Sequence, residues 1–255
     1  MSKSRKRQNQ NVQQRRTTTR PTVVGSDQAA ASLKKQKAAQ QRKSMAPRLI
    51  LVIALIIAVA GVIYLIVDKV TGDVDAPGIG KVEQELVLGD EGAPHDVIIY
   101  EDFLCPACGA MERSFDGALA DLAEEGKVRV AYRPFNLLGG WAGDAAEAFA
   151  VVLDTSDTEV AAQFHDLLFA NQPGEGGDKP GTDWFVQLAV QAGADGDAVK
   201  AGIDAGAGEQ WVKDATAAAD DAGVNSTPTV LLDGEVFEAS KAPDDRAQAL
   251  LDELR

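Results

Sequence analysis

The longest apolar run of the chain covers residues 49–67, which are 19 residues without a charge. A helix of this length is about 28 Å long, close to the roughly 30 Å core of a bilayer. A cleaved signal peptide usually has a shorter apolar region and a shorter basic region before it. We therefore predict a transmembrane signal anchor. The alternatives are a buried helix of a soluble domain and a cleaved signal peptide.

After this run the polar and apolar positions alternate between strand-like and helix-like patterns. Residues 96–100 are predicted to form a strand, and the continuous apolar run 97–100 within it is typical of a strand that is buried on both faces. A helix is predicted from Cys105 to about Glu125, and residues 128–132 alternate as a second strand. Strand, helix and strand in this order predict a βαβ unit with parallel strands. An earlier strand is predicted at 82–88.

A helical block follows, from about residue 142 to 222, and in it Ser156 and Glu159 have the spacing of a capping box. The remaining predicted elements are strands at 229–232 and 235–237, joined by an Asp-Gly hairpin turn, and an amphipathic helix at 244–254. This order predicts an α/β fold in which helices cover a mixed sheet.

Charge divides the chain at the apolar run. Residues 1–48 hold 13 Lys and Arg against one acidic residue, a net charge of +12, whereas residues 68–255 hold 12 against 38, a net charge of −26. We expect 1–48 to be a disordered basic tail on the cytoplasmic side of the membrane, with no nucleic-acid partner. Residues 68–80 are then a linker, and 81–255 form one domain outside the cytoplasm.

The only two cysteines, Cys105 and Cys108, enclose Pro106 and Ala107 at the predicted strand-to-helix turn. The N-terminus of a helix has unpaired N–H groups and a partial positive charge, which favour a thiolate. We therefore expect Cys105 to be the nucleophile and Cys108 to be the more buried resolving cysteine. Pro106 suits the first turn because it has no N–H to leave unpaired.

Two other interpretations of this pair remain. A purely structural disulfide would gain little from closing so short a loop. A zinc site would need two more ligands, and the spacing of the only histidines, His95 and His165, around the cysteines matches no common zinc site. We predict a redox pair and no metal site, with His165 on a helix surface or between subdomains.

At this point the sequence resembles a known family. Residues 102–108, Asp-Phe-Leu-Cys-Pro-Ala-Cys, are similar to the active-site stretch of the DsbA-like thiol–disulfide oxidoreductases, especially the membrane-anchored, thioredoxin-fold members common in actinobacteria. The stretch 223–229, Gly-Val-Asn-Ser-Thr-Pro-Thr, resembles their cis-proline loop, and the helical block resembles their inserted helical domain.

The resemblance implies a thioredoxin-like mixed sheet and a cis bond before Pro228. It also implies that Pro228 belongs to the catalytic site with the two cysteines, and that Thr227 and Pro106 contact the substrate. No cofactor is expected besides the Cys105–Cys108 disulfide.

The sequence departs from this family at two positions. The fold often carries a buried acid where this chain has Ile99, so Glu101 or Asp102 is our candidate proton acceptor; strict alternation sends them to opposite sides of the sheet. Ala107 stands where many strong oxidases have a histidine that stabilises the thiolate.

The implied activity is oxidation of cysteine pairs in exported proteins, with a separate membrane protein as the reoxidant. A reductase or isomerase of the same fold, and a non-catalytic chaperone or scaffold, remain as alternatives.

Overall fold

The structure, a computed structural model, describes residues 34–35, 54–60, 74–174, 179–238 and 242–255. No helix among these residues is both long enough and apolar enough to cross a membrane. The predicted span at 49–67 lies outside the described residues except for 54–60, which are helical. The predicted tail at 1–48 also lies outside them except for 34–35.

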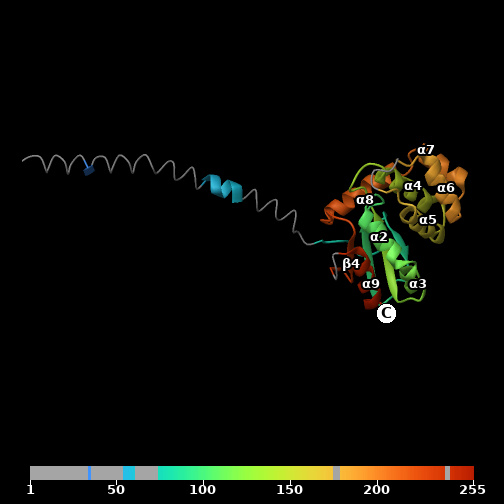
Figure 1. Cartoon of the computed structure of the whole chain (residues 1–255), viewed down its shortest axis with the longest axis horizontal. Helices are drawn as coiled ribbons and strands as arrows, with labels where there is room; N and C mark the ends of the chain where they lie inside the picture. The colour runs from blue at the N-terminus through green and yellow to red at the C-terminus, as the bar shows by residue number, and fades with distance from the viewer. Residues whose placement is uncertain (1–33, 36–53, 61–73, 175–178, 239–241) are drawn as a thin grey trace, which may run out of the picture. The chain divides into compact units, whose positions relative to one another are not determined.

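The described part of residues 74–255 contains both strands and helices (Figure 1). In chain order they are β1 (Leu86–Leu88), β2 (His95–Glu101), α2 (Pro106–Phe115), α3 (Ala118–Glu124), β3 (Val128–Pro134), α4 (Ala142–Thr155), α5 (Thr158–Ala170), α6 (Thr182–Ala192), α7 (Gly196–Asp204), α8 (Glu209–Asp221), β4 (Thr229–Leu232), β5 (Glu235–Val236) and α9 (Pro243–Glu253).

The strands of the described residues form one mixed sheet in the order β1-β3-β2-β4-β5. β2 and β3 are parallel, with Ile99 opposite Tyr132, and α2 and α3 connect them, which confirms the predicted βαβ unit. β1 and β4 run antiparallel to their neighbours. The predicted hairpin is also present: Asp233 and Gly234, between β4 and β5, have φ angles of 52° and 86°. An Asp-Gly pair adopts this left-handed conformation readily.

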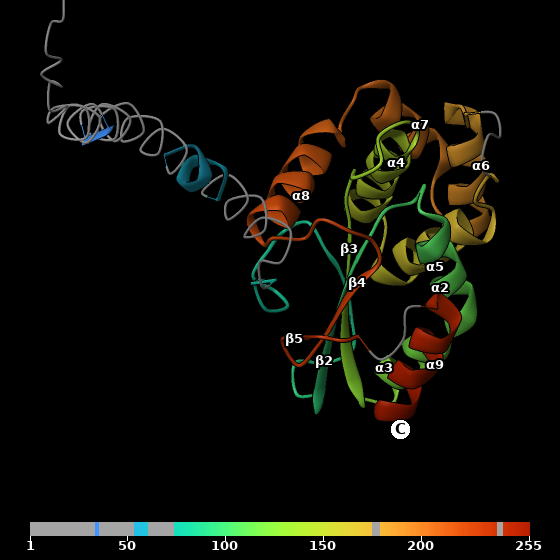
Figure 2. The ribbon, with the colours of Figure 1, turned by 60° about the vertical axis from the view of Figure 1, so that its left-hand side comes forward.

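Helices cover both faces of the sheet (Figure 2). Along β2, Val97 and Ile99 belong to the apolar cluster that includes α2, α3 and α9. Ile98 and Tyr100 point to the opposite face, where they cluster with side chains of α8. The expectation that this strand is buried on both faces is therefore confirmed.

Between β3 and β4, the described residues form five helices, α4 to α8. α5 packs against α4 and α6 within this block, and it also contacts α2, the helix that begins at the cysteines. The N-cap of α5 is Asp157, whose carboxylate accepts a hydrogen bond from Val160 N at 2.9 Å. The capping box predicted at Ser156 was thus wrong by one residue, because the neighbouring Asp157 provides the capping oxygen.

The single helix predicted from Cys105 to Glu125 is wrong. It is divided into α2 and α3 by Asp116 and Gly117, whose φ angles are 47° and 79°. Glycine, and less often aspartate, adopts this left-handed conformation at low cost, and a helix cannot continue through it.

The strand predicted at 82–88 is shorter than expected and contains only β1. Just before it, Glu85 is buried and binds Arg133 of β3, with Oε2 2.8 Å from Nη2. The other carboxylate oxygen accepts a hydrogen bond from Gly80 N at 2.5 Å. This buried ion pair holds residues 80–85 in a turn, so the strand begins only at Leu86.

Candidate active site

The two cysteines lie at the N-terminus of α2, where β2 gives way to the helix. Cys105 is the N-cap residue, with φ −71° and ψ 116°, and Pro106 is the first helical residue and is exposed. Both thiols are free. Cys105 is 6% exposed and Cys108 is fully buried. The chain therefore presents Cys105 to an incoming group and encloses Cys108.

The surroundings of Cys105 favour its thiolate. A hydrogen bond from Cys108 is the largest cause that lowers the pKa of the Cys105 thiol to about 5. Burial opposes this change, while the Thr227 side chain and the backbone N–H groups of Cys108 and Ala107 support it. These N–H groups are the free donors of the first helical turn.

The surroundings of Cys108, in contrast, disfavour its thiolate. Burial raises the pKa of the Cys108 thiol well above its ordinary value, and the neighbouring charge of Cys105 acts in the same direction. At neutral pH the reduced site therefore holds one thiolate, on Cys105, and one thiol, on Cys108. The two sulfurs differ as an attacking and a resolving cysteine do.

The loop before β4 faces the cysteines. The Thr227–Pro228 bond is cis, as the resemblance implied. In the thiol form, Cys105 Sγ donates a hydrogen bond to the carbonyl oxygen of Thr227 at 3.4 Å. Beside this contact lies a hollow of about 230 Å³ whose lining includes Ala107, Thr227, Pro228 and Arg246. The exposed Pro106 is not among its described lining residues.

Asp102 fixes the turn that carries Cys105. One oxygen of its buried carboxylate accepts from Leu104 N at 2.7 Å, and the other accepts from Leu137 N and Leu138 N, each at 2.9 Å. Burial raises the pKa of Asp102, and these hydrogen bonds oppose that rise. Because both oxygens already accept backbone hydrogens, Asp102 acts here as a positioning residue.

The side chain of Glu101, the last residue of β2, faces α5. It is fully buried, and its Oε1 lies 2.5 Å from Nε2 of His165, while Oε2 has no hydrogen-bond partner among the described residues. Burial raises the pKa of Glu101, and its charge is one of the causes that raise the pKa of Cys108. Of the two candidate proton acceptors, Glu101 is the one with a free buried oxygen.

Of the two placements predicted for His165, the helix surface is wrong and the position between subdomains is right, because it is fully buried where α5 of the helical block faces Glu101 of the sheet. The rings of Phe103, Tyr132, Phe149 and Phe169 surround it. Burial, the largest single effect, lowers the pKa of His165, but the charge of Glu101, the hydrogen bonds to Asp166 and Glu101 and the charge of Glu112 together hold it well above its ordinary value.

Sequence reasoning missed Gln172, which follows α5. Its Nε2 donates to the carbonyl oxygens of Phe103 at 2.9 Å and Cys105 at 3.0 Å. A side chain at Gly109 would collide with Gln172, so the glycine leaves room for this contact. Gln172 lies in a Gly- and Pro-rich loop, where nothing in the local pattern distinguishes it from a solvent-exposed amide.

Comparisons with known proteins agree with this geometry. A family model described as thioredoxin matches residues 81–253. The reduced disulfide bond oxidoreductase DsbG from Mycobacterium tuberculosis is 30% identical, covers 67% of this chain and 86% of its own, and has a TM-score of 0.56. Reduced DsbA from Mycobacterium tuberculosis is 28% identical, with coverages of 66% and 99% and a TM-score of 0.54.

Oxidised BdbD from Bacillus subtilis is 21% identical, covers 71% of this chain and 97% of its own, and has a TM-score of 0.62. A comparison with curated proteins finds no match. The residues matched by the family model include the sheet, the helical block and both loops of the site.

Proposed function

Since the chain belongs to the thioredoxin family and is a DsbA-like thiol–disulfide oxidoreductase, we propose that it donates the Cys105–Cys108 disulfide to cysteine pairs of exported proteins. In the proposed arrangement, residues 1–48 are a cytoplasmic tail, 49–67 a single membrane span, and 68–80 a linker. The domain at 81–255 then acts outside the cytoplasm.

The reaction is two successive thiol–disulfide exchanges. A substrate thiolate attacks Sγ of Cys105, so that a mixed disulfide forms and the Cys105–Cys108 bond breaks. Cys108 leaves as a thiolate and takes up a proton, because burial raises its pKa. The second substrate thiolate then attacks the first substrate sulfur and expels Cys105 as a thiolate. The substrate loses two electrons, and the cysteine pair gains them.

The single observation that carries this direction is the lowered pKa of Cys105, about 5. A thiol of low pKa is a good leaving group in the second exchange, and a stabilised thiolate favours the reduced pair and so makes the disulfide a stronger oxidant. This environment forms although Ala107 replaces the histidine of many strong oxidases. The donors are instead Cys108, Thr227 and two backbone N–H groups.

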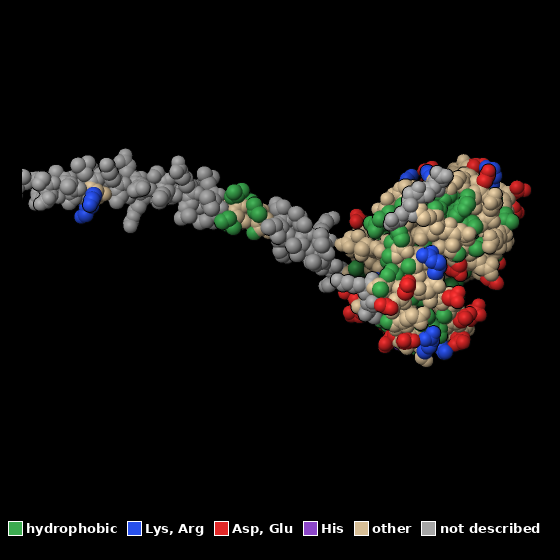
Figure 3. Space-filling view, viewed as in Figure 1, with side chains coloured by type: hydrophobic (Ala, Val, Ile, Leu, Met, Phe, Trp, Pro, Cys, Tyr) green, Lys and Arg blue, Asp and Glu red, His purple; other side chains and the backbone are tan. Residues whose placement is uncertain are grey.

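The hollow beside Pro228 supports the proposed substrate class. An extended peptide next to Cys105 would meet the backbone of the cis-proline loop, and backbone hydrogen bonds do not discriminate between side chains. On the face of the domain in Figure 3, acidic side chains are more widespread than basic ones, which disfavours anionic partners such as nucleic acid.

The proposed membrane anchor has support from the described part of the span. Residues 54–60 are helical, and Leu55, Ile56 and Ile57 are more than half exposed. A bilayer would cover such apolar side chains. A separate membrane protein is the proposed reoxidant, because each turnover leaves two electrons on the cysteine pair.

The test is the reduction potential of the Cys105–Cys108 pair, measured by equilibrating the purified protein with glutathione. Thiol–disulfide proteins range from about −270 mV for thioredoxin to about −120 mV for DsbA. We expect a value near the oxidising end. A value near the reducing end would favour the reductase or isomerase, and a value below about −300 mV would indicate a structural disulfide and thus the non-catalytic scaffold.

A further inference from the structure

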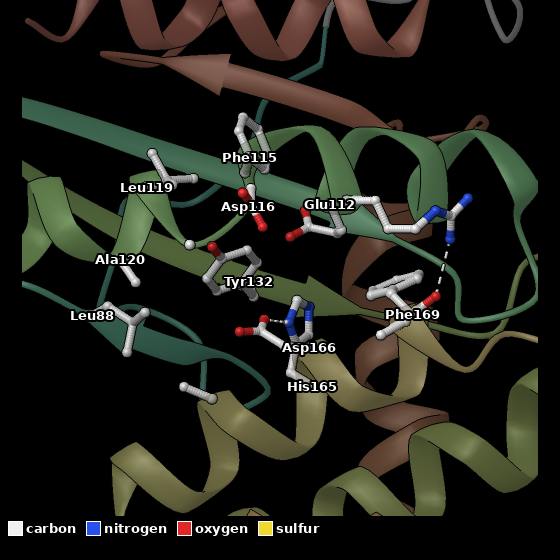
Figure 4. A pocket seen from close by; sticks show the side chains of 14 residues that line it. Leu88, Glu112, Phe115, Asp116, Leu119, Ala120, Tyr132, His165, Asp166 and Phe169 are labelled. Atoms are coloured by element: carbon white, nitrogen blue, oxygen red, sulfur yellow. Dashed lines mark hydrogen bonds and ion pairs between the residues drawn. The ribbon is translucent and has the colours of Figure 1, made fainter.

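Beneath the helix that carries the cysteines lies a pocket that disulfide exchange does not use. Figure 4 shows the side chains of Glu112, His165 and Asp166 meeting there, from α2 and α5. Their potential ligand atoms all lie within 4.8 Å of one another. We propose that these three residues bind one divalent transition-metal ion of the Zn²⁺ type.

The hydrogen bonds of His165 prepare one ring nitrogen for a metal. Nε2 lies 2.5 Å from Glu101 Oε1, and Nδ1 lies 3.1 Å from Asp166 Oδ1. A carboxylate that accepts from one ring nitrogen fixes the tautomer and orients the other nitrogen toward a metal, the arrangement found around many zinc ions. Glu101 is in the position of this outer carboxylate. A cation on Nδ1 would replace the hydrogen that now lies between His165 and Asp166.

The spacing of the first two ligands suits a metal ion. Zn²⁺ binds histidine nitrogen and carboxylate oxygen at about 2.0–2.2 Å in tetrahedral geometry, so two ligands of one ion lie about 3.4 Å apart. His165 Nδ1 and Asp166 Oδ1 are 3.1 Å apart and need to separate only slightly to reach this spacing. The third ligand, Glu112, must move inward by a change in its side-chain torsions.

A second, independent observation is the state of the Glu112 carboxylate. Its Oε1 is buried and has no hydrogen-bond partner among the described residues. A buried polar atom without a partner costs free energy, and such atoms often mark a missing ion or water. The pocket is a hollow of about 230 Å³ that also includes Tyr132 and Phe169 in its lining, so a hydrated ion can enter.

The ligand set indicates the class of ion. One imidazole and two carboxylates, with water as a fourth ligand, match the nitrogen and oxygen ligands of Zn²⁺, whereas Ca²⁺ and Mg²⁺ prefer oxygen ligands alone. The ion would link α2, whose N-cap residue is Cys105, to α5 of the helical block. The sequence predicted no metal site, because these three ligands come together only in the fold.

The test uses the purified full-length protein, without a histidine tag and with the Cys105–Cys108 disulfide formed, so that thiolates cannot take up the metal. Zn²⁺ is titrated calorimetrically after treatment with a chelator. We expect one Zn²⁺ per chain and a Tm that rises with added Zn²⁺. Asp166→Asn and Glu112→Gln should each weaken binding at least about tenfold, and Glu101→Gln by about 10- to 100-fold.

Asp166 is exposed, so its substitution leaves the core intact even if variants of buried residues fail to fold. The matched control is Glu124→Gln, which removes an exposed carboxylate from α3 and should bind Zn²⁺ like the parent protein. No saturable Zn²⁺ binding, unchanged affinity of Asp166→Asn and Glu112→Gln, or tighter binding of Ca²⁺ than of Zn²⁺ would overturn the proposal.

Discussion

The carbonyl oxygen of Thr227 accepts a hydrogen bond from Sγ of Cys105 at 3.4 Å, although the two residues are 122 positions apart. The contact joins the loop before β4 to the start of α2. Through the Thr227 side chain, this loop also contributes to the low pKa of Cys105. The environment and the pKa of Cys105 therefore depend on two segments that are distant in the sequence, and each segment can be changed separately by mutation.

Replacing Cys108 with serine should trap substrates on the enzyme. In Cys108→Ser the mixed disulfide at Cys105 can no longer be resolved by the second cysteine, so covalent adducts accumulate. They are detected on non-reducing gels and released by dithiothreitol. Cys105→Ser is the control, because Cys108 is fully buried and should form few adducts. Equal adduct formation by the two variants would contradict the assignment of Cys105 as the attacking residue.

The stability of the reduced protein should depend on pH in a defined direction. The pKa of Cys105 is about 5, whereas an unfolded cysteine titrates near about 8.5. A depressed pKa stabilises the folded, reduced protein fully above about pH 8.5, and this contribution is lost as the pH falls to about 5. The oxidised protein lacks this contribution to stability, because a disulfide sulfur does not ionise.

We therefore expect the unfolding free energy of the reduced protein, minus that of the oxidised protein, to rise between about pH 5 and 8.5. Urea denaturation at a series of pH values measures it. Alkylation of the reduced protein by iodoacetamide should show a half-maximal thiolate fraction near pH 5. A flat difference together with half-maximal alkylation above pH 8 would show that Cys105 is an ordinary thiol.

Thr227→Val should raise the pKa of Cys105 while keeping the shape of the side chain. The variant removes the hydroxyl that helps to lower this pKa. A hydrogen bond to a charged group contributes about 1.5 kcal/mol or more, which corresponds to a rise of about one pH unit. Alkylation rates against pH report the value. Ser226→Ala, at the exposed neighbouring position, is the control and should leave it unchanged.

Asp102→Asn should destabilise the protein, because an amide NH₂ group would face backbone N–H donors that now bind a carboxylate. Leaving a buried donor unsatisfied costs about 1–3 kcal/mol, and we expect a loss of about 2–3 kcal/mol in urea unfolding. Asp121→Asn, at an exposed position of α3, is the control. A fall in activity without any loss of stability would instead assign Asp102 to proton transfer.

Local patterns were sufficient for much of the fold. The apolar run before Cys105 predicted β2, and the Asp-Gly pair at 233–234 predicted the hairpin. The same kind of signal was overlooked at Asp116 and Gly117, where the chain leaves the helix. Turn chemistry was decisive at both places, because few residue pairs adopt the left-handed conformation cheaply.

The candidate site was only partly predictable. The cysteines and the cis-proline loop carry recognisable motifs, but the role of Gln172 depends on a contact across 67 positions. The burial of His165 could have been predicted, since Ala161, Leu168 and Phe169 lie three or four positions from it on the apolar face of α5. A polar residue in such a stripe needs a buried partner, and the sequence does not show that Glu101 lies across from it.

The Asp102 carboxylate also has a mechanical consequence. It holds Leu104, next to the reactive cysteine, and at the same time Leu137 and Leu138, whose side chains are 38% and 51% exposed. A protein that binds against these two leucines would contact residues whose backbone N–H groups bind the Asp102 carboxylate, which also holds the turn before Cys105. A displacement of Leu137 and Leu138 by a bound protein would therefore shift the Asp102 carboxylate, and with it the turn that positions Cys105.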